Sequence, residues 1–155
     1  MAGPRPLDGV KVLDLSRVFA GPIAGRTLSD LGADVVKIEP PDGDVTRLWG
    51  RKTAGLSTYF TQQNCGKRNV CIDLQADGGP ELVLQLAEQA DVLIENFRPG
   101  VMAKFGLDWA TVHARHPELI MLSISGFGQD GPAAGRPAYD TVAQAASGFL
   151  SLLIN

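Results

Sequence analysis

The sequence is poor in the residues that build metal centres and disulfide frameworks. Its 155 residues include 2 cysteines and 2 histidines. The spacing of Cys65 and Cys71 is not that of a metal site, and two cysteines make no disulfide framework. His113 and His116 lie on one predicted helix without a third ligand, so a solvated helix face explains them better. We therefore expect no metal site, and we expect Cys65 to be a buried structural cysteine.

The sequence also has no large excess of positive or negative charge and no long apolar run. The formal net charge is −3, and nucleic-acid binding usually needs a concentrated basic surface, so we expect no nucleic-acid partner. No apolar run approaches the roughly 18 residues needed to cross a bilayer, so we expect no membrane partner. The start, MAGPRPLDG, lacks the layout of a signal peptide. These absences predict a cytoplasmic protein.

Short apolar runs alternate with helical patterns along the whole chain. Residues 10–15 (VKVLDL) predict a strand, Gly21-Pro22 opens a helix over 23–31, and residues 33–39 predict a second strand. Strand, helix and strand in this order form a βαβ unit with parallel strands. Hydrophobic residues make up 45% of the sequence, which suits one globular domain.

The rest of the chain continues this alternation. Residues 40–57 predict a surface loop, and residues 139–153 an amphipathic helix. Further strands are predicted at 69–74, 92–95 and 119–124, with helices at 59–65, from Gly79 onward, at 99–105 and at 109–115. The pattern predicts an α/β fold, a Rossmann-like and mostly parallel sheet flanked by helices. Because the last helix ends on apolar residues with no closing strand, we expect the domain to be incomplete at residue 155.

Two glycine patterns raise the possibility of a nucleotide site. Gly126-Phe-Gly-Gln-Asp-Gly131 follows a predicted strand, but the residues after it (PAAGRP) are typical of a loop. No carboxylate follows about 20 residues later, where a ribose contact is expected. Gly21 and Gly25 lie at the first strand-to-helix turn, where a phosphate turn and close helix–sheet packing explain them equally well. A dinucleotide-binding module therefore stays as an alternative function.

Several arginines follow predicted strands or lie in loops. Parallel strands bring their carboxyl ends to one edge of a sheet, so Arg17, Arg98 and Arg136 can gather around one anionic ligand. Arginine forks and glycine-rich backbone favour phosphate groups. Scattered, solvated charges are the other explanation.

A series of segments, in chain order, resembles the signature blocks of the class III coenzyme A transferases. They are PLDGVKVLDLSRVFAGP (6–22), LGADVVKIEPPDGDVTR (31–47), YFTQQNCGKRNVCIDL (59–74), ADVLIENFRPGVMAKFGL (90–107) and SISGFGQDGPAAGRPAYDTVAQAASG (123–148). This family includes formyl-CoA:oxalate CoA-transferase and carnitine CoA-transferase, and its superfamily includes α-methylacyl-CoA racemase. The resemblance implies that residues 1–155 form the amino-terminal, coenzyme A-binding part of the family's large domain, without the remainder of that domain or the small domain.

The resemblance also implies a substrate site. Coenzyme A and acyl-CoA are expected as substrates, with no tightly bound cofactor. Together with Arg17 from the anion argument, the implied coenzyme A contacts are Phe19, Ala20, Ile72, Asp73, Leu74, Gln75, Asn96, Phe97, Arg98, Lys104, Arg136, Pro137, Ala138 and Tyr139. Pro40 and Pro137 stand where formyl-CoA:oxalate CoA-transferase has basic residues, so phosphate contacts are expected to shift, for example to Arg136. Phe19 replaces a glutamine of that enzyme, so its particular substrate does not carry over.

The implied reaction moves coenzyme A from an acyl-CoA thioester to a carboxylic acid acceptor, through an aspartyl anhydride and an aspartyl thioester. The nucleophilic aspartate is expected beyond residue 155; Asp140 is not that residue. We therefore assign no catalytic residue and expect the chain alone to be inactive. Tyr139 stands where the racemase has its histidine, and a tyrosine with a pKa near 10 is a poor base. This favours a transferase over the alternative, α-methylacyl-CoA racemase. The complete protein is expected to form an interlocked homodimer.

Overall fold

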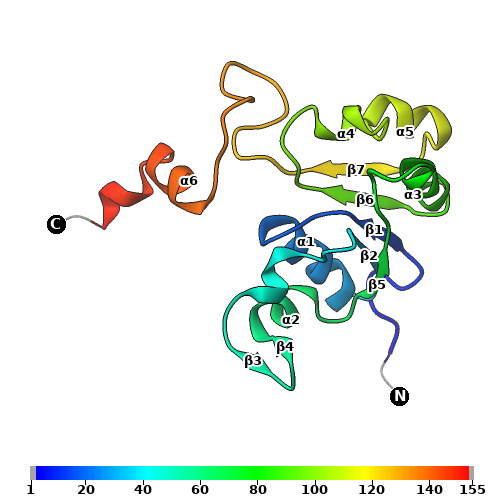
Figure 1. Ribbon diagram of the computed structural model, residues 1–155, viewed down its shortest axis with the longest axis horizontal. Coiled ribbons are helices and arrows are strands. Elements are labelled where there is room, and N and C mark those ends of the chain that lie inside the picture. The colour runs from blue at the N-terminus through cyan, green and yellow to red at the C-terminus, as the bar shows by residue number, and fades with distance from the viewer. Residues whose placement is uncertain (1–2, 154–155) are drawn as a thin grey trace.

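The computed structural model describes residues 3–153, and a five-stranded parallel sheet forms its centre (Figure 1). The strands pair in the order β5-β2-β1-β6-β7, and every pair is parallel. They are β1 (Lys11–Asp14), β2 (Asp34–Glu39), β5 (Arg68–Cys71), β6 (Val92–Glu95) and β7 (Ile120–Ser123). The chain adds strands outward on one side of β1 and then on the other, which is the Rossmann order. The predicted fold class is confirmed.

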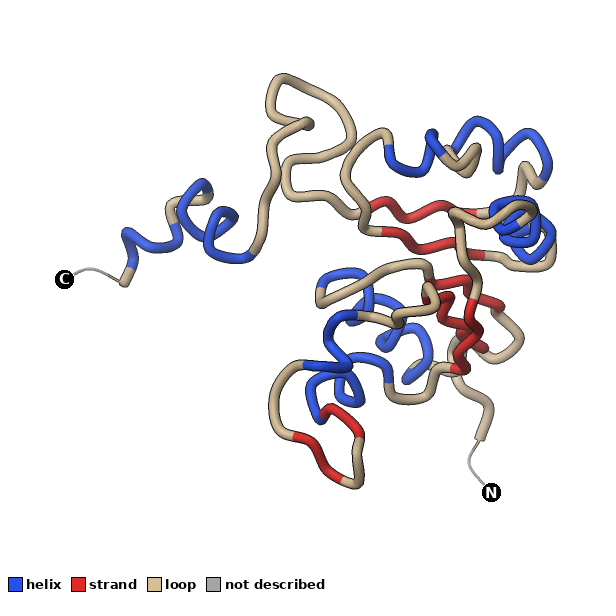
Figure 2. The backbone as a smooth tube through the Cα atoms, viewed as in Figure 1, coloured by secondary structure: helices blue, strands red, loops and turns tan. Residues whose placement is uncertain are grey.

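Helices cover both faces of this sheet (Figure 2). Helix α1 (Ala20–Asp30) packs on one face, and the other face is covered by α3 (Gly79–Ala87), α4 (Val101–Lys104) and α5 (Trp109–Arg115). Because successive side chains of a strand point to opposite faces, Leu13 and Leu93 enter the core under α3, whereas Val12, Val35 and Ile94 face α1. The apolar runs of the central strands β1, β2 and β6 are therefore buried on both sides, whereas the edge strands β5 and β7 have no fully buried residue.

Residues 40–57 are more ordered than the predicted loop. They contain a short 3-10 helix, η1 (Val45–Leu48), and a small antiparallel hairpin made of β3 (Lys52–Thr53) and β4 (Leu56–Ser57). Helix α2 (Thr58–Asn64) follows directly. Side-chain caps fix both helix starts, because Asp44 accepts a hydrogen bond from Thr46 N and Ser57 accepts one from Phe60 N. The prediction of a surface loop therefore missed one short 3-10 helix and a small hairpin within these residues.

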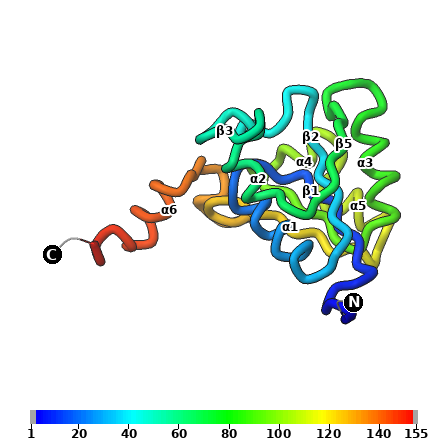
Figure 3. Tube along the Cα trace, turned by 90° about the horizontal axis from the view of Figure 1, so that it is seen from below, coloured from blue at the N-terminus to red at the C-terminus, as the bar shows by residue number. Residues whose placement is uncertain are grey.

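The predicted amphipathic helix over 139–153 is also corrected. The structure has two short helices there, α6 (Asp140–Ala146) and the 3-10 helix η2 (Phe149–Leu152). Gly148 between them has φ 77°, a left-handed conformation that ends a helix. Neither helix has a buried residue, and both extend away from the sheet (Figure 3). The apolar face of this segment therefore meets no partner among residues 3–153.

The two cysteines lie at the surface, and the two histidines are half-buried. Cys65 and Cys71 are both exposed, so the expected burial of Cys65 was wrong: α2 ends just before it and turns its polar residues Gln63 and Asn64 inward instead. His113 stacks on Trp109. Within residues 3–153 no cluster of acidic, histidine or cysteine side chains is suited to a metal ion, and no helix there is long and apolar enough to cross a membrane.

Candidate functional site

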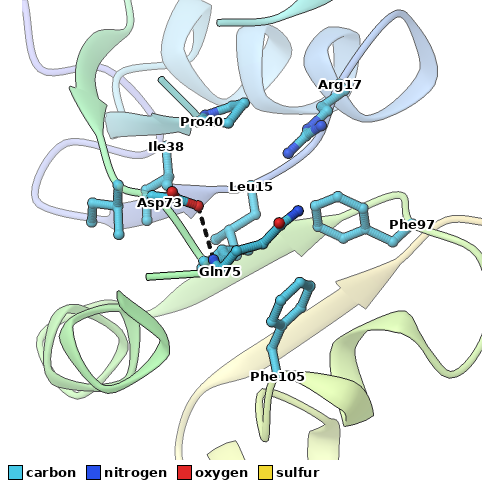
Figure 4. Close-up of a pocket in the computed structure, with 10 residues that line it drawn as sticks. Leu15, Arg17, Ile38, Pro40, Asp73, Gln75, Phe97 and Phe105 are labelled. Carbon is cyan, nitrogen blue, oxygen red and sulfur yellow. Dashed lines mark hydrogen bonds between the residues drawn. The ribbon is translucent and has the colours of Figure 1, made fainter. Parts of the chain in front are cut away.

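A pocket opens at the carboxyl ends of the central strands, on the face covered by α3 and α4 (Figure 4). The segments that follow β1, β2, β5 and β6 all contribute to it. Its walls are Leu15, Arg17, Ile38, Pro40, Ile72, Asp73, Leu74, Gln75, Phe97 and Phe105. The strand order reverses between β1 and β6, and open α/β sheets bind ligands in the crevice at such a reversal.

Part of the predicted site meets in this pocket. Arg17, Phe97 and the run 72–75 lie far apart in the sequence, and parallel pairing brings them to one edge of the sheet. Leu15, Ile38 and Phe105 complete the apolar lining and were missed, because a buried strand residue looks the same in the sequence whether or not it borders a pocket. Pro40, which stands where formyl-CoA:oxalate CoA-transferase has a basic residue, also lines the pocket.

The lining combines apolar walls with one cationic group. The Arg17 guanidinium lies 5.3 Å from the centre of the Phe97 ring, and its Nε is buried without a hydrogen-bond partner in the described part of the chain. The guanidinium and the Gln75 side chain face each other across the pocket (Figure 4). Asp73 accepts a hydrogen bond from Gln75 N at 2.9 Å, which shapes the turn after β5. An unpaired guanidinium beside apolar walls suits an anionic group carried on a largely apolar or planar body.

The pocket is small. It encloses about 60 Å³, against roughly 300 Å³ or more for a site that takes a whole drug-sized ligand. It therefore suits one part of a ligand, with the remainder lying along the outer surface of the sheet edge.

The other predicted contacts lie outside the pocket. Phe19 precedes α1 and is 48% exposed, with Ala20 beginning that helix. Arg98 is exposed after β6, and Lys104 is exposed at the end of α4. Arg136 lies over the Phe127 ring at 5.1 Å in the loop after β7, and Pro137, Ala138 and Tyr139 follow it toward α6. Of the three arginines expected around one anion, Arg17 alone lines the pocket.

Asn96 connects the pocket to the turn after β1 without lining it. Its Oδ1 accepts a hydrogen bond from Arg17 N at 2.7 Å, and its Nδ2 donates one to Arg17 O at 2.7 Å. Next to it, Glu95 accepts a hydrogen bond from Phe97 N at 2.8 Å. Burial raises the pKa of the Glu95 carboxyl, despite the hydrogen bonds from Ser123 and Phe97. The end of β6 thus fixes both Arg17 and Phe97.

The sequence did not reveal a group of paired charges, most of them buried, on the α1 side of the same strand ends. We call Asp14, Lys37, Glu39, Asp44, Arg47 and Lys67 the ionic cluster. The side chains of Lys37 and Asp44 are both 0% exposed and lie 3.3 Å apart. Burial alone raises the pKa of the Asp44 carboxyl, but hydrogen bonds from Thr46 and the charge of Lys37 lower it by more, so this pKa lies below its ordinary value.

A second buried pair completes the ionic cluster. Lys67 Nζ lies 2.7 Å from Asp14 Oδ2 and also donates to Pro22 O and Asn64 Oδ1. Burial lowers the pKa of Lys67 despite the neighbouring carboxylate. One sequence signal was present: Lys37 stands between apolar residues in VVKIE, and a charge on an inward-facing strand position needs a buried partner.

The glycine patterns resolve in favour of packing. A Cβ on Gly25 would lie 2.6 Å from Asp14 Oδ2 and 3.1 Å from Lys67 Nζ, so glycine is required for α1 to approach the ionic cluster. The glycines between Gly126 and Gly131 open no helix, as expected for a loop. Gly126 instead lies against Ala138, where a Cβ would collide.

Known proteins are similar to this chain in sequence and in fold. The sequence profile of CoA-transferase family III matches residues 7–154. The chain belongs to that family. It is 46% identical to the succinate–glutarate CoA-transferase of Agrobacterium fabrum, over 95% of the chain and 39% of that protein. It is also 46% identical to the acetyl-CoA:oxalate CoA-transferase of Acetobacter aceti, over 94% of the chain and 38% of that protein.

A solved structure shows the same arrangement. A CAIB/BAIF family protein from Brucella suis superimposes with a TM-score of 0.89 at 47% identity, covering 94% of this chain and 40% of that one. The family III chain described here therefore has its relatives' fold over their matched part, and it spans about two fifths of their length.

Proposed function

We propose that this chain forms the coenzyme A-binding part of an enzyme that transfers coenzyme A from an acyl-CoA to a carboxylic acid. The observation that carries the proposal is the pocket itself, because it places the unpaired Arg17 guanidinium beside the apolar walls formed by Phe97, Phe105 and Ile72 in a family III chain. Coenzyme A has the matching chemistry: phosphate groups joined to a planar adenine nucleoside at one end and to a long, uncharged arm at the other.

In this proposal the pocket holds one section of coenzyme A and the surrounding surface holds the rest. Arg17 binds a phosphate, Phe97 contacts the uncharged section beside it, and the turn 72–75 supplies backbone and side-chain hydrogen bonds. Outer contacts are proposed for the residues outside the pocket that the family resemblance indicates, which are Phe19, Ala20, Arg98, Lys104, Arg136, Pro137, Ala138 and Tyr139. Asn96 contributes through its hydrogen bonds to the Arg17 backbone.

The proposed reaction belongs to the complete enzyme. A carboxylate attacks the carbonyl carbon of the acyl-CoA, releasing coenzyme A thiolate and forming a mixed anhydride. The thiolate then attacks the enzyme's own carbonyl and releases the acyl carboxylate, which leaves coenzyme A on the enzyme as a thioester. An acceptor acid reverses these steps. We propose that the attacking aspartate comes from a part of the enzyme that this chain does not contain, and that the complete enzyme is a cytoplasmic homodimer.

Coenzyme A binding to the chain tests the proposal, measured by isothermal titration calorimetry. Arg17→Ala removes one charge-assisted contact, worth about 1.5–3 kcal/mol, so the affinity is expected to fall about 10- to 100-fold. Arg115→Ala is the matched control, because Arg115 pairs with Glu81 and Glu88 away from the pocket. Pantetheine, which has no phosphate, should bind the wild type and Arg17→Ala alike. Equal coenzyme A affinity in the wild type and Arg17→Ala would contradict the proposed site.

A further inference from the structure

The turn between β1 and α1 has an unusual backbone. Val18 has φ 69°, in the left-handed region that β-branched residues rarely occupy. Such a conformation persists where the surroundings hold it in place, and it tends to occur at functional sites. The residue before it is Arg17, whose side chain enters the pocket.

Side chains from three other segments hold the backbone of this turn. Lys37 Nζ, from β2, donates a hydrogen bond to Ser16 O at 2.5 Å. The Asn96 side chain bonds to both backbone groups of Arg17. Asp44 Oδ2, from the loop after β2, accepts a hydrogen bond from Val18 N at 3.2 Å. Three consecutive residues are thus fixed by partners that lie far away in the sequence.

These partners support one another. Lys37 and Asp44 form a buried ion pair, and Thr46 donates two hydrogen bonds to the other Asp44 oxygen. With 0% of either charged side chain exposed, water cannot easily replace a lost partner. Asp44 therefore neutralises Lys37 and fixes Val18 at the same time.

The arrangement also determines where the Arg17 side chain points. Its neighbours Ser16 and Val18 are held toward the ionic cluster, and the intervening side chain projects to the opposite side, into the pocket (Figure 4). Asn96 uses both ends of its side-chain amide on the Arg17 backbone. Its contribution is therefore to hold the arginine, with its amide already engaged before any ligand arrives.

We infer that Asp44, Lys37 and Asn96 are positioning residues, which hold the strained Arg17–Val18 turn so that the Arg17 guanidinium is ready to bind the ligand's anionic group. The inference rests on the proposed function for the identity of that ligand. Without these partners Val18 relaxes toward negative φ and turns the Arg17 side chain away. The ligand must then restore the turn as it binds, and the apparent affinity falls by the fraction of molecules in which the turn is still held.

Asp44→Asn and Val18→Gly together test this inference. Asp44→Asn removes the charge that faces Lys37 and weakens the bond to Val18, so coenzyme A affinity is expected to fall about 10-fold. Glycine adopts φ 69° without strain, so Val18→Gly added to Asp44→Asn should restore most of that affinity. A purely structural role for Asp44 would give no such rescue. Asp34→Asn is the control: this carboxylate is exposed, pairs with Arg68 at the amino end of β2, and should leave binding unchanged.

Amide hydrogen exchange without ligand, measured by NMR, reports on the turn separately. The Arg17 and Val18 amides should be protected in the wild type, and the Val18 amide should exchange faster in Asp44→Asn. Should Asp44→Asn fold poorly, Asn96→Ala releases the Arg17 backbone without leaving a buried charge, and it should also expose the Arg17 amide and weaken binding. Unchanged affinity in a variant whose turn is released would overturn the inference. If the wild type does not bind coenzyme A, the proposed function fails, while the exchange data still decide whether these side chains hold the turn.

Discussion

The two faces of the central sheet are built in different ways. Under α3 and α5 the buried core is mainly apolar, with Leu13 and Leu93 from the strands and Val83 and Val112 from the helices, apart from the buried carboxyl of Glu95 at the end of β6. Under α1, apolar contacts such as that of Val35 fill the amino ends of the strands, and the ionic cluster fills the carboxyl ends. Apolar contacts are not directional, whereas buried charges need partners at fixed distances and angles. The first face supplies stability and the pocket wall, and the second fixes the loops around the pocket.

Removing one charge from the ionic cluster is expected to have the largest effect on stability. Lys37→Met leaves Asp44 buried without its cationic partner, so the free energy of unfolding is expected to fall by about 3–5 kcal/mol. Urea unfolding measures the loss. The double variant Lys37→Met, Asp44→Asn removes both charges and should recover part of it. A loss below about 1 kcal/mol in the single variant would show that the cluster behaves like a surface ion pair.

A cavity-forming substitution under α3 measures how much the mainly apolar face contributes to the free energy of unfolding. Leu93→Ala removes a side chain that is fully buried under α3, so it should reduce the free energy of unfolding by about 2–5 kcal/mol, and by less if the helix can settle into the space. The Arg17–Val18 turn lies on the other side of the strand ends, so its amide protection should persist up to the unfolding transition. Early exchange of the Val18 amide in this variant would show that the two faces are not independent.

The pH dependence of the free energy of unfolding should also differ between variants on the two faces, but by a smaller amount. Hydrogen bonds and neighbouring cations lower the pKa values of Asp44 and Glu39 below their ordinary values, despite the opposing effect of burial. The folded chain therefore binds these protons less readily than the unfolded chain, so this stability is present above about pH 4 and is lost as the pH falls toward the lowered pKa values. Urea unfolding at a series of pH values should give a flatter acid limb for Asp44→Asn, whereas Leu93→Ala should run parallel to the wild type.

Local patterns sufficed to predict the sheet, and non-local geometry explains what they missed. The strands around Val12, Val35 and Leu93 are short β-branched or leucine runs between glycine-containing turns, so their type and parallel order follow from neighbouring residues. The partners of Lys37 lie in two separate loops, whose conformations depend on the folded sheet. For the same reason the sequence could list Arg17 and Arg136 as anion contacts but could not show that only Arg17 reaches the pocket. The break at Gly148 depended on one backbone angle within an otherwise helical pattern.

The central position of β1 has a consequence for the order in which the protein folds during synthesis. Of the five strands in this sheet β1 is synthesised first and its neighbour β2 soon after, but the other edge of β1 pairs with β6, which is synthesised much later. The Lys11 amide donates a hydrogen bond to the Asp91 carboxylate, which is synthesised 80 residues later. At 5–20 residues per second this interval lasts roughly 4–16 s. During that time one edge of the apolar first strand has no partner, which makes the nascent chain a candidate for chaperone protection until residues 92–95 emerge.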